Sequence, residues 1–501
     1  MGREVGQLAF AEADYALFRD RLRQQLHTLA DLTRHASFGA QPPTLGAELE
    51  MPLAGDHGRP VPLNMAVRDA LLDERLTLEV TRHNLEANLT PVALAGCPFT
   101  ELAREAAWML TRVTALARAN HGARAVSIGT LPTLTPADLT GEMLTPAPRY
   151  HALERAWARR VPNPFPLRVR GRELLRARPV TVQGAVCSWQ VHLTVPPDRF
   201  NRTFNAAQLA TGPALAAAGN SPLPLGHHGW QESRITWYEQ GFGDRQPGRS
   251  RRAPRPRVGF GRAWLRGSRI AAFEEAVHRY DVLLPDTTGG DDRADGERCP
   301  PLEELRLHLS TVWPWNRPVY DPTGHLRIEF RALPSGPTPL DMAANTAFLI
   351  GLTLSLTSGG HDVATALPFA YARANFYRAA RDGLRSSLWW PSPTSGAPRE
   401  HGAADLVRQL LPRARAGLLS AGVRAAEADT SLELLRHRVT TGHTGARWQE
   451  RALEALEGPA TPTHPGRPER RTAALRELTT RYARLAERQA PVHTWPLPPH
   501  S

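Results

Sequence analysis

The segment that begins at His325 alternates strictly between apolar and charged residues as far as Arg331. Successive side chains of a β-strand point to opposite faces of its sheet, so the charged residues share one face, namely Arg327, Glu329 and Arg331. A carboxylate between two guanidinium groups is costly in a core but suits a site that binds metal and phosphate. The solvated outer face of an antiparallel sheet would give the same pattern, so this segment alone leaves both interpretations open.

Four other segments separate polar from apolar residues in the same way. Their polar faces carry Glu48 and Glu50 (segment 45–51), Glu86 and Asn88 (85–90), Gln190, His192 and Thr194 (189–195), and Arg306 and His308 (305–310). Carboxylates come first along the chain, and imidazoles and guanidiniums come later. This grouping predicts one sheet with a shared polar cavity on its concave face.

Composition is that of a soluble globular enzyme, with 41% hydrophobic and 22% charged residues among 501. No apolar run reaches the roughly 18 residues that a membrane span needs, and the most apolar stretch, 347–356, predicts a buried helix. The first residues do not form a signal-peptide pattern. Cys97, Cys187 and Cys299 lack metal-ligand spacing, which indicates a reducing cytoplasm and no structural disulfide.

The net charge of +12 raises the hypothesis of nucleic-acid binding. However, the sequence contains no lysine, so all of the basic residues are arginines, as GC-rich coding would produce. These arginines are dispersed, except in the Pro-containing loop 245–257, and no aromatic residues interleave with that run. We therefore expect no specific nucleic-acid partner and no membrane partner.

Periodicity predicts an α+β fold with one predominantly antiparallel sheet and helices packed on its apolar, outer face. We expect strands near 44–53, 76–90, 125–131, 185–195, 304–312 and 325–333, and helices at 7–35, 64–73, 100–119, 149–159 and 200–218. Residues 1–390 would form the catalytic domain, and 391–501 a helical C-terminal extension packed on it. The aromatic–basic segment 313–317 is expected to be a loop that covers a nucleotide, lines the pocket or packs in the core.

Taken in order, several motifs resemble those of the glutamate–cysteine ligase family, in its type 2 or carboxylate–amine ligase branch of the glutamine synthetase-like superfamily. The matching segments are Gly46–Glu50, Glu86–Pro91, Ile128–Pro132, Gln190–Leu193, Asn220–Pro222, Glu232–Arg234 and Leu326–Arg331, with 442–449 and 491–496 fitting one long subgroup. Two departures are Gly219, where alanine is usual, and the long basic loop 245–257.

The resemblance implies a funnel-shaped active site in which ATP drives the joining of an amine to the γ-carboxylate of L-glutamate, through a γ-glutamyl phosphate. L-Cysteine would be the amine. Two or three Mg²⁺ ions, or Mn²⁺, would be held by Glu48, Glu50, Glu86, His192 and Glu329, since these ions prefer such ligands. Arg234, Arg327 and Arg331 would act on the phosphoryl group and the substrate carboxylate. Nucleotide and substrate contacts would come from Gln190, Asn220, Ser221, His308 and Arg317.

Other functions stay open from the sequence. The amine acceptor could differ from cysteine, and a catalytically inactive, nucleotide-binding regulatory homologue would share the fold. A charge-driven nucleic-acid binder is the third alternative, and its binding would disappear with added salt. The oligomeric state cannot be read from these residues, nor can the division of metal binding between Glu48 and Glu50.

Overall fold

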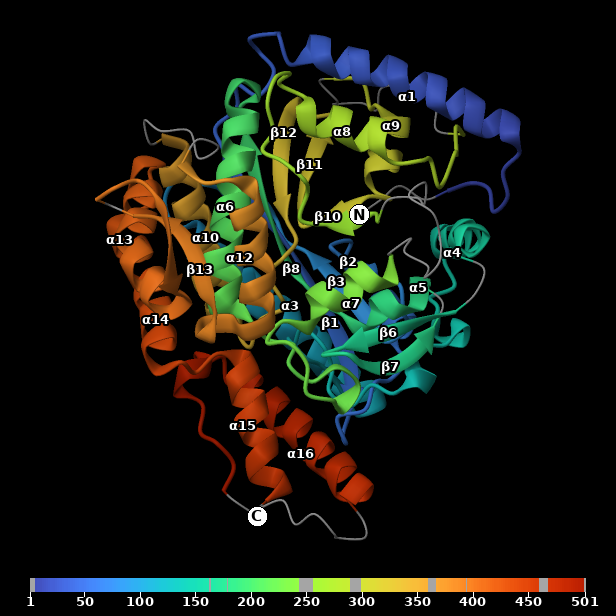
Figure 1. Ribbon diagram of the computed structural model, residues 1–501. Coiled ribbons are helices and arrows are strands. Elements are labelled where there is room, and N and C mark those ends of the chain that lie inside the picture. The colour runs from blue at the N-terminus through green and yellow to red at the C-terminus, as the bar shows by residue number, and fades with distance from the viewer. Residues whose placement is uncertain are drawn as a thin grey trace.

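The computed structural model describes residues 5–161, 164–177, 179–242, 256–288, 299–358, 366–392, 394–458 and 467–499 (Figure 1). Within these ranges one sheet of eight strands forms the centre, in the order β11-β12-β8-β1-β3-β2, with β4 and β5 also paired to β1. Its strands are β1 (Thr44–Gly55), β2 (Leu76–Leu78), β3 (Asn84–Asn88), β4 (Val92–Ala93), β5 (Ala123–Ala125), β8 (Trp189–Val195), β11 (Asn316–Asp321) and β12 (His325–Phe330). All of these strands pair antiparallel, which confirms the predicted fold class.

The register of the strands brings the polar residues of the sequence together. Glu50 lies opposite Glu86, and Glu48 lies opposite Gln190. On the other side of β8, His192 lies opposite Glu329. Residues directly opposite in an antiparallel pair share a face, with Cβ atoms roughly 5 Å apart. The alternation seen in each separate segment therefore becomes one continuous polar face.

Long helices cover the apolar face. Helix α3 (Pro98–His121) packs against β1, α6 (Phe200–Ala218) against β11 and β12, and α10 (Pro339–Ser358) against β8. Figure 1 shows α12 (Phe369–Asp382), α13 (Ala403–Ser420) and α14 (Ala425–Thr441) gathered with α6 and α10 on this side of the sheet. Among the described helices, α10 alone is long and apolar enough to span a membrane, but 83% of its apolar window is buried in the protein. The run 347–356 is thus the buried helix that the sequence predicts.

Smaller elements surround the polar face. Helix α1 (Glu12–Leu32) packs on α8 (Ala271–Arg279) and α9 (Glu303–Leu309), at the top of Figure 1. The remaining elements are α2 (Asn64–Leu71), α4 (Pro148–Arg160), α5 (Pro179–Val182), α7 (Ser233–Gly241), the hairpin of β6 (Phe165–Val169) and β7 (Arg172–Ala177), and the parallel pair of β9 (Val258–Gly259) and β10 (Trp313–Pro314).

The last two helices, α15 (Gly445–Glu457) and α16 (Arg467–Glu487), pack on each other around a second apolar cluster that contains Trp448, Tyr482 and Trp495. Before them, a hairpin of β13 (Ser387–Pro391) and β14 (Pro398–Gly402) stands at the start of the C-terminal extension, which we expected to be helical from residue 391. This hairpin also spans residue 390, where we placed the domain boundary. That boundary stays a prediction.

Three further predictions of secondary structure are wrong. Residues 303–309 form the helix α9 instead of a strand over 304–312, because this segment is buried almost all round and its period does not separate helix from strand. The expected loop 313–317 contains β10 and the start of β11. Of the predicted strand 125–131 only its first residue lies in a strand, β5. Residues 245–255 of the basic loop 245–257 lie outside the described residues.

Candidate active site

A cavity of about 420 Å³ opens on the polar face of the sheet. Its wall includes side chains from five strands of the sheet, from the residues that directly follow two strands, and from α7, among them Glu48, Glu50, Glu79, Glu86, Gln190, Arg234, Tyr238, Arg317 and Arg331. A second cavity of about 260 Å³ adjoins it and is lined by Glu48, His192, Asp321, Arg317 and Arg327. Because Glu48 and Arg317 line both, the two cavities form one candidate site.

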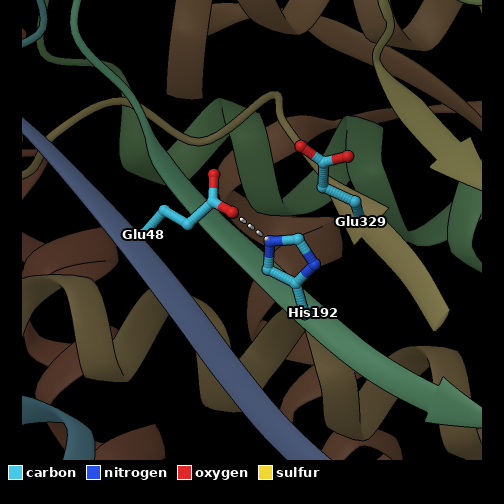
Figure 2. A group of neighbouring side chains, drawn as sticks. All are labelled: Glu48, His192 and Glu329. Carbon is cyan, nitrogen blue, oxygen red and sulfur yellow. Dashed lines mark ion pairs between the residues drawn. The ribbon is translucent and has the colours of Figure 1, made fainter. Parts of the chain in front are cut away.

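One group of possible metal ligands consists of Glu48, His192 and Glu329, whose ligand atoms lie within 4.8 Å of one another. Figure 2 shows the three side chains converging from β1, β8 and β12. His192 Nε2 lies 3.1 Å from Glu48 Oε1, but neither ring nitrogen makes a well-aligned hydrogen bond within the described chain. A buried imidazole beside two carboxylates, with a nitrogen free to donate a lone pair, fits a divalent cation.

A second group consists of Glu50, Glu79 and Glu86, again within 4.8 Å. Burial and the neighbouring Glu79 raise the pKa of Glu50 to about 7. Burial, with the carboxylates of Glu48 and Glu79, raises the pKa of Glu86 well above its usual range. Three acids this close together resist ionising together unless a cation compensates them, and an all-oxygen ligand set suits Mg²⁺.

Glu329 lies between two guanidinium groups, as the sequence predicts, but they belong to Arg317 and Arg331 and not to Arg327 and Arg331. Its two carboxylate oxygens accept hydrogen bonds from Arg317 and Arg331. Although burial alone would raise it, these two arginines hold the pKa of Glu329 at about 2. Arg317 lies directly opposite Glu329 on β11, whereas Arg327 is two positions away on the same strand.

Arg327 instead forms an ion pair with Asp321, at 3.2 Å, on the wall of the smaller cavity. Arg331 also donates to the side-chain oxygen of Gln190. Arg317 and Arg331 each engage one oxygen of Glu329, so each oxygen keeps a second lone pair with which it can ligate a metal ion.

Arg234 lines the larger cavity and is fixed from behind by buried acceptors. Its guanidinium donates to Glu232 Oε1 at 3.0 Å and to the carbonyl oxygens of Ala332 and Arg331 at 3.2 and 3.3 Å. Glu232 in turn accepts from the Ser221 hydroxyl at 2.7 Å. The segment around Asn220–Pro222 thus positions an arginine at the end of β12.

Residues 44–478 match the model of glutamate–cysteine ligase family 2 (GCS2). The chain belongs to this family. The family match indicates a ligase of the glutamate–cysteine ligase type.

A solved structure shows the same fold. Glutamate–cysteine ligase of Francisella tularensis, in complex with AMP, superposes with a TM-score of 0.53 at 12% identity, over 92% of this chain and 91% of that one. A bifunctional glutathione synthetase of Pasteurella multocida gives a TM-score of 0.48 at 12% identity, over 93% of this chain and 55% of its own. No curated protein sequence matches significantly.

Three residues that the family resemblance places at the nucleotide or substrate line neither cavity. Asn220 and Ser221 are fully buried: the Asn220 side-chain amide donates to Ser335 O at 2.7 Å and to the Tyr482 hydroxyl at 2.8 Å. His308 lies on α9, with Nε2 3.1 Å from Ala276 O, and burial lowers its pKa to about 4. The strand-face position expected for His308 is wrong, because the segment is helical. By contrast, Gln190 and Arg317 do line the site.

In this family member, sequence reasoning missed Tyr238 and left Glu79 out of the expected metal ligands. Glu79 shares an alternation with Thr77, between Leu76, Leu78 and Val80, and that signal could have identified it. Tyr238 lies on α7, with its hydroxyl beside Arg331, and burial raises its pKa. No local pattern marks Tyr238, because only tertiary packing brings α7 to the cavity.

Proposed function

We propose that this protein is an ATP-dependent ligase that joins the γ-carboxylate of L-glutamate to an amine, with L-cysteine as the first acceptor to test. The observation that carries the proposal is the cavity in which Glu48, Glu50, Glu79 and Glu86 meet three arginines, Arg234, Arg317 and Arg331, in a member of glutamate–cysteine ligase family 2. Such a cavity suits a reaction between anions, which needs fixed positive charge and metal ions away from water.

The proposed reaction has two steps. A γ-carboxylate oxygen of glutamate attacks the γ-phosphorus of ATP, the bond to the bridging oxygen breaks, and ADP leaves. The amine nitrogen then attacks the acyl carbon of the γ-glutamyl phosphate, loses a proton, and expels inorganic phosphate. Both steps move negative charge, so stabilisation by positioned cations would supply most of the rate enhancement.

The groups Glu50–Glu79–Glu86 and Glu48–His192–Glu329 would hold the divalent cations. When bound, Mg²⁺ would neutralise the phosphate oxygens and orient the γ-phosphoryl group for in-line attack. Mn²⁺ is an acceptable substitute where an imidazole joins the carboxylates. We expect two or three ions, as the two groups suggest.

The arginines would hold the anionic substrates. Arg331 and Arg317, paired with Glu329 in this structure, would turn toward the transferred phosphoryl group. Arg234 is fixed by Glu232, and its other N–H groups would donate hydrogen bonds to the phosphoryl group or the glutamate α-carboxylate. Arg327, at the edge of the smaller cavity, would contribute to the potential that attracts anions.

The two halves of the proposal are tested separately. With Mg²⁺, ATP and L-glutamate, hydroxylamine should trap the activated acyl group as glutamyl hydroxamate. Mass spectrometry should then detect γ-glutamylcysteine when L-cysteine replaces hydroxylamine. Hydroxamate without γ-glutamylcysteine would keep the ligase and reject cysteine. An ADP-release screen with one amine at a time would then identify the acceptor.

If neither product forms with ATP and Mg²⁺ saturating, the ligase proposal fails. The alternative would then be a regulatory homologue that binds nucleotide without ligation, which calorimetric binding of ATP in the absence of turnover would support. The intact acids and arginines of the site favour the active enzyme. We also propose a cytoplasmic location, in keeping with the three free thiols among the described residues.

A further inference from the structure

A cavity separate from the candidate active site lies where α13, α14 and α15 meet the turn after α12. Its volume is about 440 Å³, and none of its lining residues lines the two cavities of the candidate site. Four arginines border it: Arg408 from α13, Arg447 and Arg451 from α15, and Arg385 from the turn. The single carboxylate on its wall is that of Asp382. The cavity is thus lined mainly by positive charge.

Part of this charge is already compensated. Arg408 pairs with Asp405, Arg447 pairs with Glu450 at 2.5 Å, and Asp382 accepts from Arg381, which lies outside the cavity, at 2.8 Å. This accounts for each acidic group at the cavity.

Two guanidinium groups have no such partner. Arg385 and Arg451 are exposed, and neither makes a hydrogen bond or ion pair with another residue in the described ranges. Two unpaired guanidiniums that border one cavity match the charge of a phosphate dianion and can donate to its oxygens in bidentate fashion. The hydroxyl-bearing residues Thr440 and Thr444 line the same cavity and can add hydrogen bonds.

We propose that this cavity binds a small phosphate-bearing molecule, and that its occupancy acts on the candidate active site. The connection begins at Arg447, whose partner Glu450 also accepts from Gln231 Nε2 at 2.6 Å. Gln231 lines the cavity and is followed directly by Glu232, the residue that fixes Arg234. An anion that draws Arg447 away from Glu450 therefore changes a contact only three residues in sequence from a guanidinium of the site.

Backbone contacts continue the same path. The carbonyl of Gln231 accepts from Ser221 N at 3.3 Å, and Glu232 N donates to Ala380 O at 2.8 Å, just before the turn that carries Arg385. One side of this segment thus faces the arginine-lined cavity, while the other supports the candidate site.

Binding is tested first, without any assay of activity. The double variant Arg385→Gln/Arg451→Gln is compared with Arg104→Gln, which removes an exposed arginine of α3 that has no ion-pair partner among the residues the structure describes and lines none of these cavities. Each protein is titrated calorimetrically with inorganic phosphate at fixed ionic strength in EDTA. We expect the double variant to lose one binding event, or to weaken it about tenfold or more, relative to wild type and Arg104→Gln. Equal binding in all three proteins overturns the proposal, as does equal weakening in both variants.

The effect on the active site is tested by ADP release, which rests on the proposed ligase function. Phosphate competes at the active site of all three proteins in the same way. Any difference in how turnover responds to phosphate must therefore come from the arginine-lined cavity, and we expect wild type and Arg104→Gln to differ in this response from the double variant. Identical phosphate curves overturn the connection to Arg234. If the ligase assay itself fails, the calorimetric result still decides whether the site exists.

Discussion

The two groups of acidic residues lie on one face of the same sheet but have opposite electrostatic surroundings. In the group of Glu50, Glu79 and Glu86, carboxylates face one another, and burial with mutual repulsion raises their pKa values. In the other group, Glu329 faces Arg317 and Arg331, which lower its pKa. The first group needs a cation to be fully ionised. In the second group, Arg317 and Arg331 already balance the charge of Glu329, so an anionic substrate must compete with Glu329 for these two arginines.

The largest expected effect comes from Glu329→Gln. The change keeps the shape but removes the charge, so turnover should fall by about 10³-fold with saturating Mg²⁺. The variant also leaves Arg317 and Arg331 without a carboxylate, which we expect to cost about 3 kcal/mol of unfolding free energy. Steady-state kinetics and denaturant unfolding measure the two effects.

Glu50→Gln is the matched control within the first group. Its turnover should also fall, but the metal-free variant should lose less stability at pH 7 than Glu329→Gln, because relief of repulsion offsets the loss of one of the two hydrogen bonds that Glu50 accepts, from Ser188 N and Gln190 Nε2. Equal destabilisation of both variants would remove the distinction between the two groups.

The pH dependence of the metal-free protein gives the next effect. The pKa of Glu50 is raised from 4.5 unfolded to about 7 folded, so the folded state binds more protons between these values. Stability should therefore decrease as the pH rises from 4.5 to 7 and then level off, by at most about 3 kcal/mol for this group. Thermal unfolding in EDTA should show this slope, and Glu50→Gln should flatten it. An unchanged slope in the variant would contradict the assignment.

Glu329 contributes in a different window, which keeps the two groups separable. Its pKa is depressed to about 2, so its stabilisation is complete above 4.5 and is lost only as the pH falls below that value. Acid unfolding below pH 4.5 should therefore be changed by Glu329→Gln and little changed by Glu50→Gln.

The arginines sharpen the comparison further. Arg331→Lys keeps the charge but loses the planar fork, so kcat should fall about 30-fold while ATP affinity changes less. Arg327→Lys, at the edge of the smaller cavity, should change kcat by no more than about threefold, because Arg327 pairs with Asp321 and not with Glu329. If Arg331→Lys lowers only the melting temperature, with normal kinetics, Arg331 is structural.

The smallest effect on activity is expected for His308→Gln. The imidazole bonds Ala276 O inside the fold, away from both cavities, so kcat should stay within about twofold. Loss of the buried contact should cost about 1–2 kcal/mol of unfolding free energy. A large loss of kcat without loss of stability would return His308 to the active site.

The alternation of polar and apolar residues was sufficient to predict the sheet and the acids on its inner face, because every second side chain of a strand points to the same face of the sheet. It could not predict that Arg317 pairs with Glu329, since that contact depends on the register of β11 against β12. It failed for 304–312, where a helix buried on nearly all sides carries the same apolar density as a strand.

The role of Asn220 and Ser221 shows another limit. The motif was identified correctly as a family feature, but its side chains face Tyr482, Ser335 and Glu232, not the cavity. These partners are far apart in the sequence, and only the folded chain brings them together. A motif can therefore mark an active site while its own side chains serve to hold the neighbouring residues in position.

The contact between Asn220 and Tyr482 has a consequence for how the protein is made. The strands that carry the first acids, β1 and β3, are synthesised early, yet the turn that positions Arg234 gains this hydrogen bond only after residue 482 has left the ribosome. Gln449, on α15, donates to the same asparagine at 2.9 Å. A nascent chain can thus build the acidic half of its site long before the arginine half is secured, so an incomplete chain would lack the supported Arg234 that the proposed reaction requires.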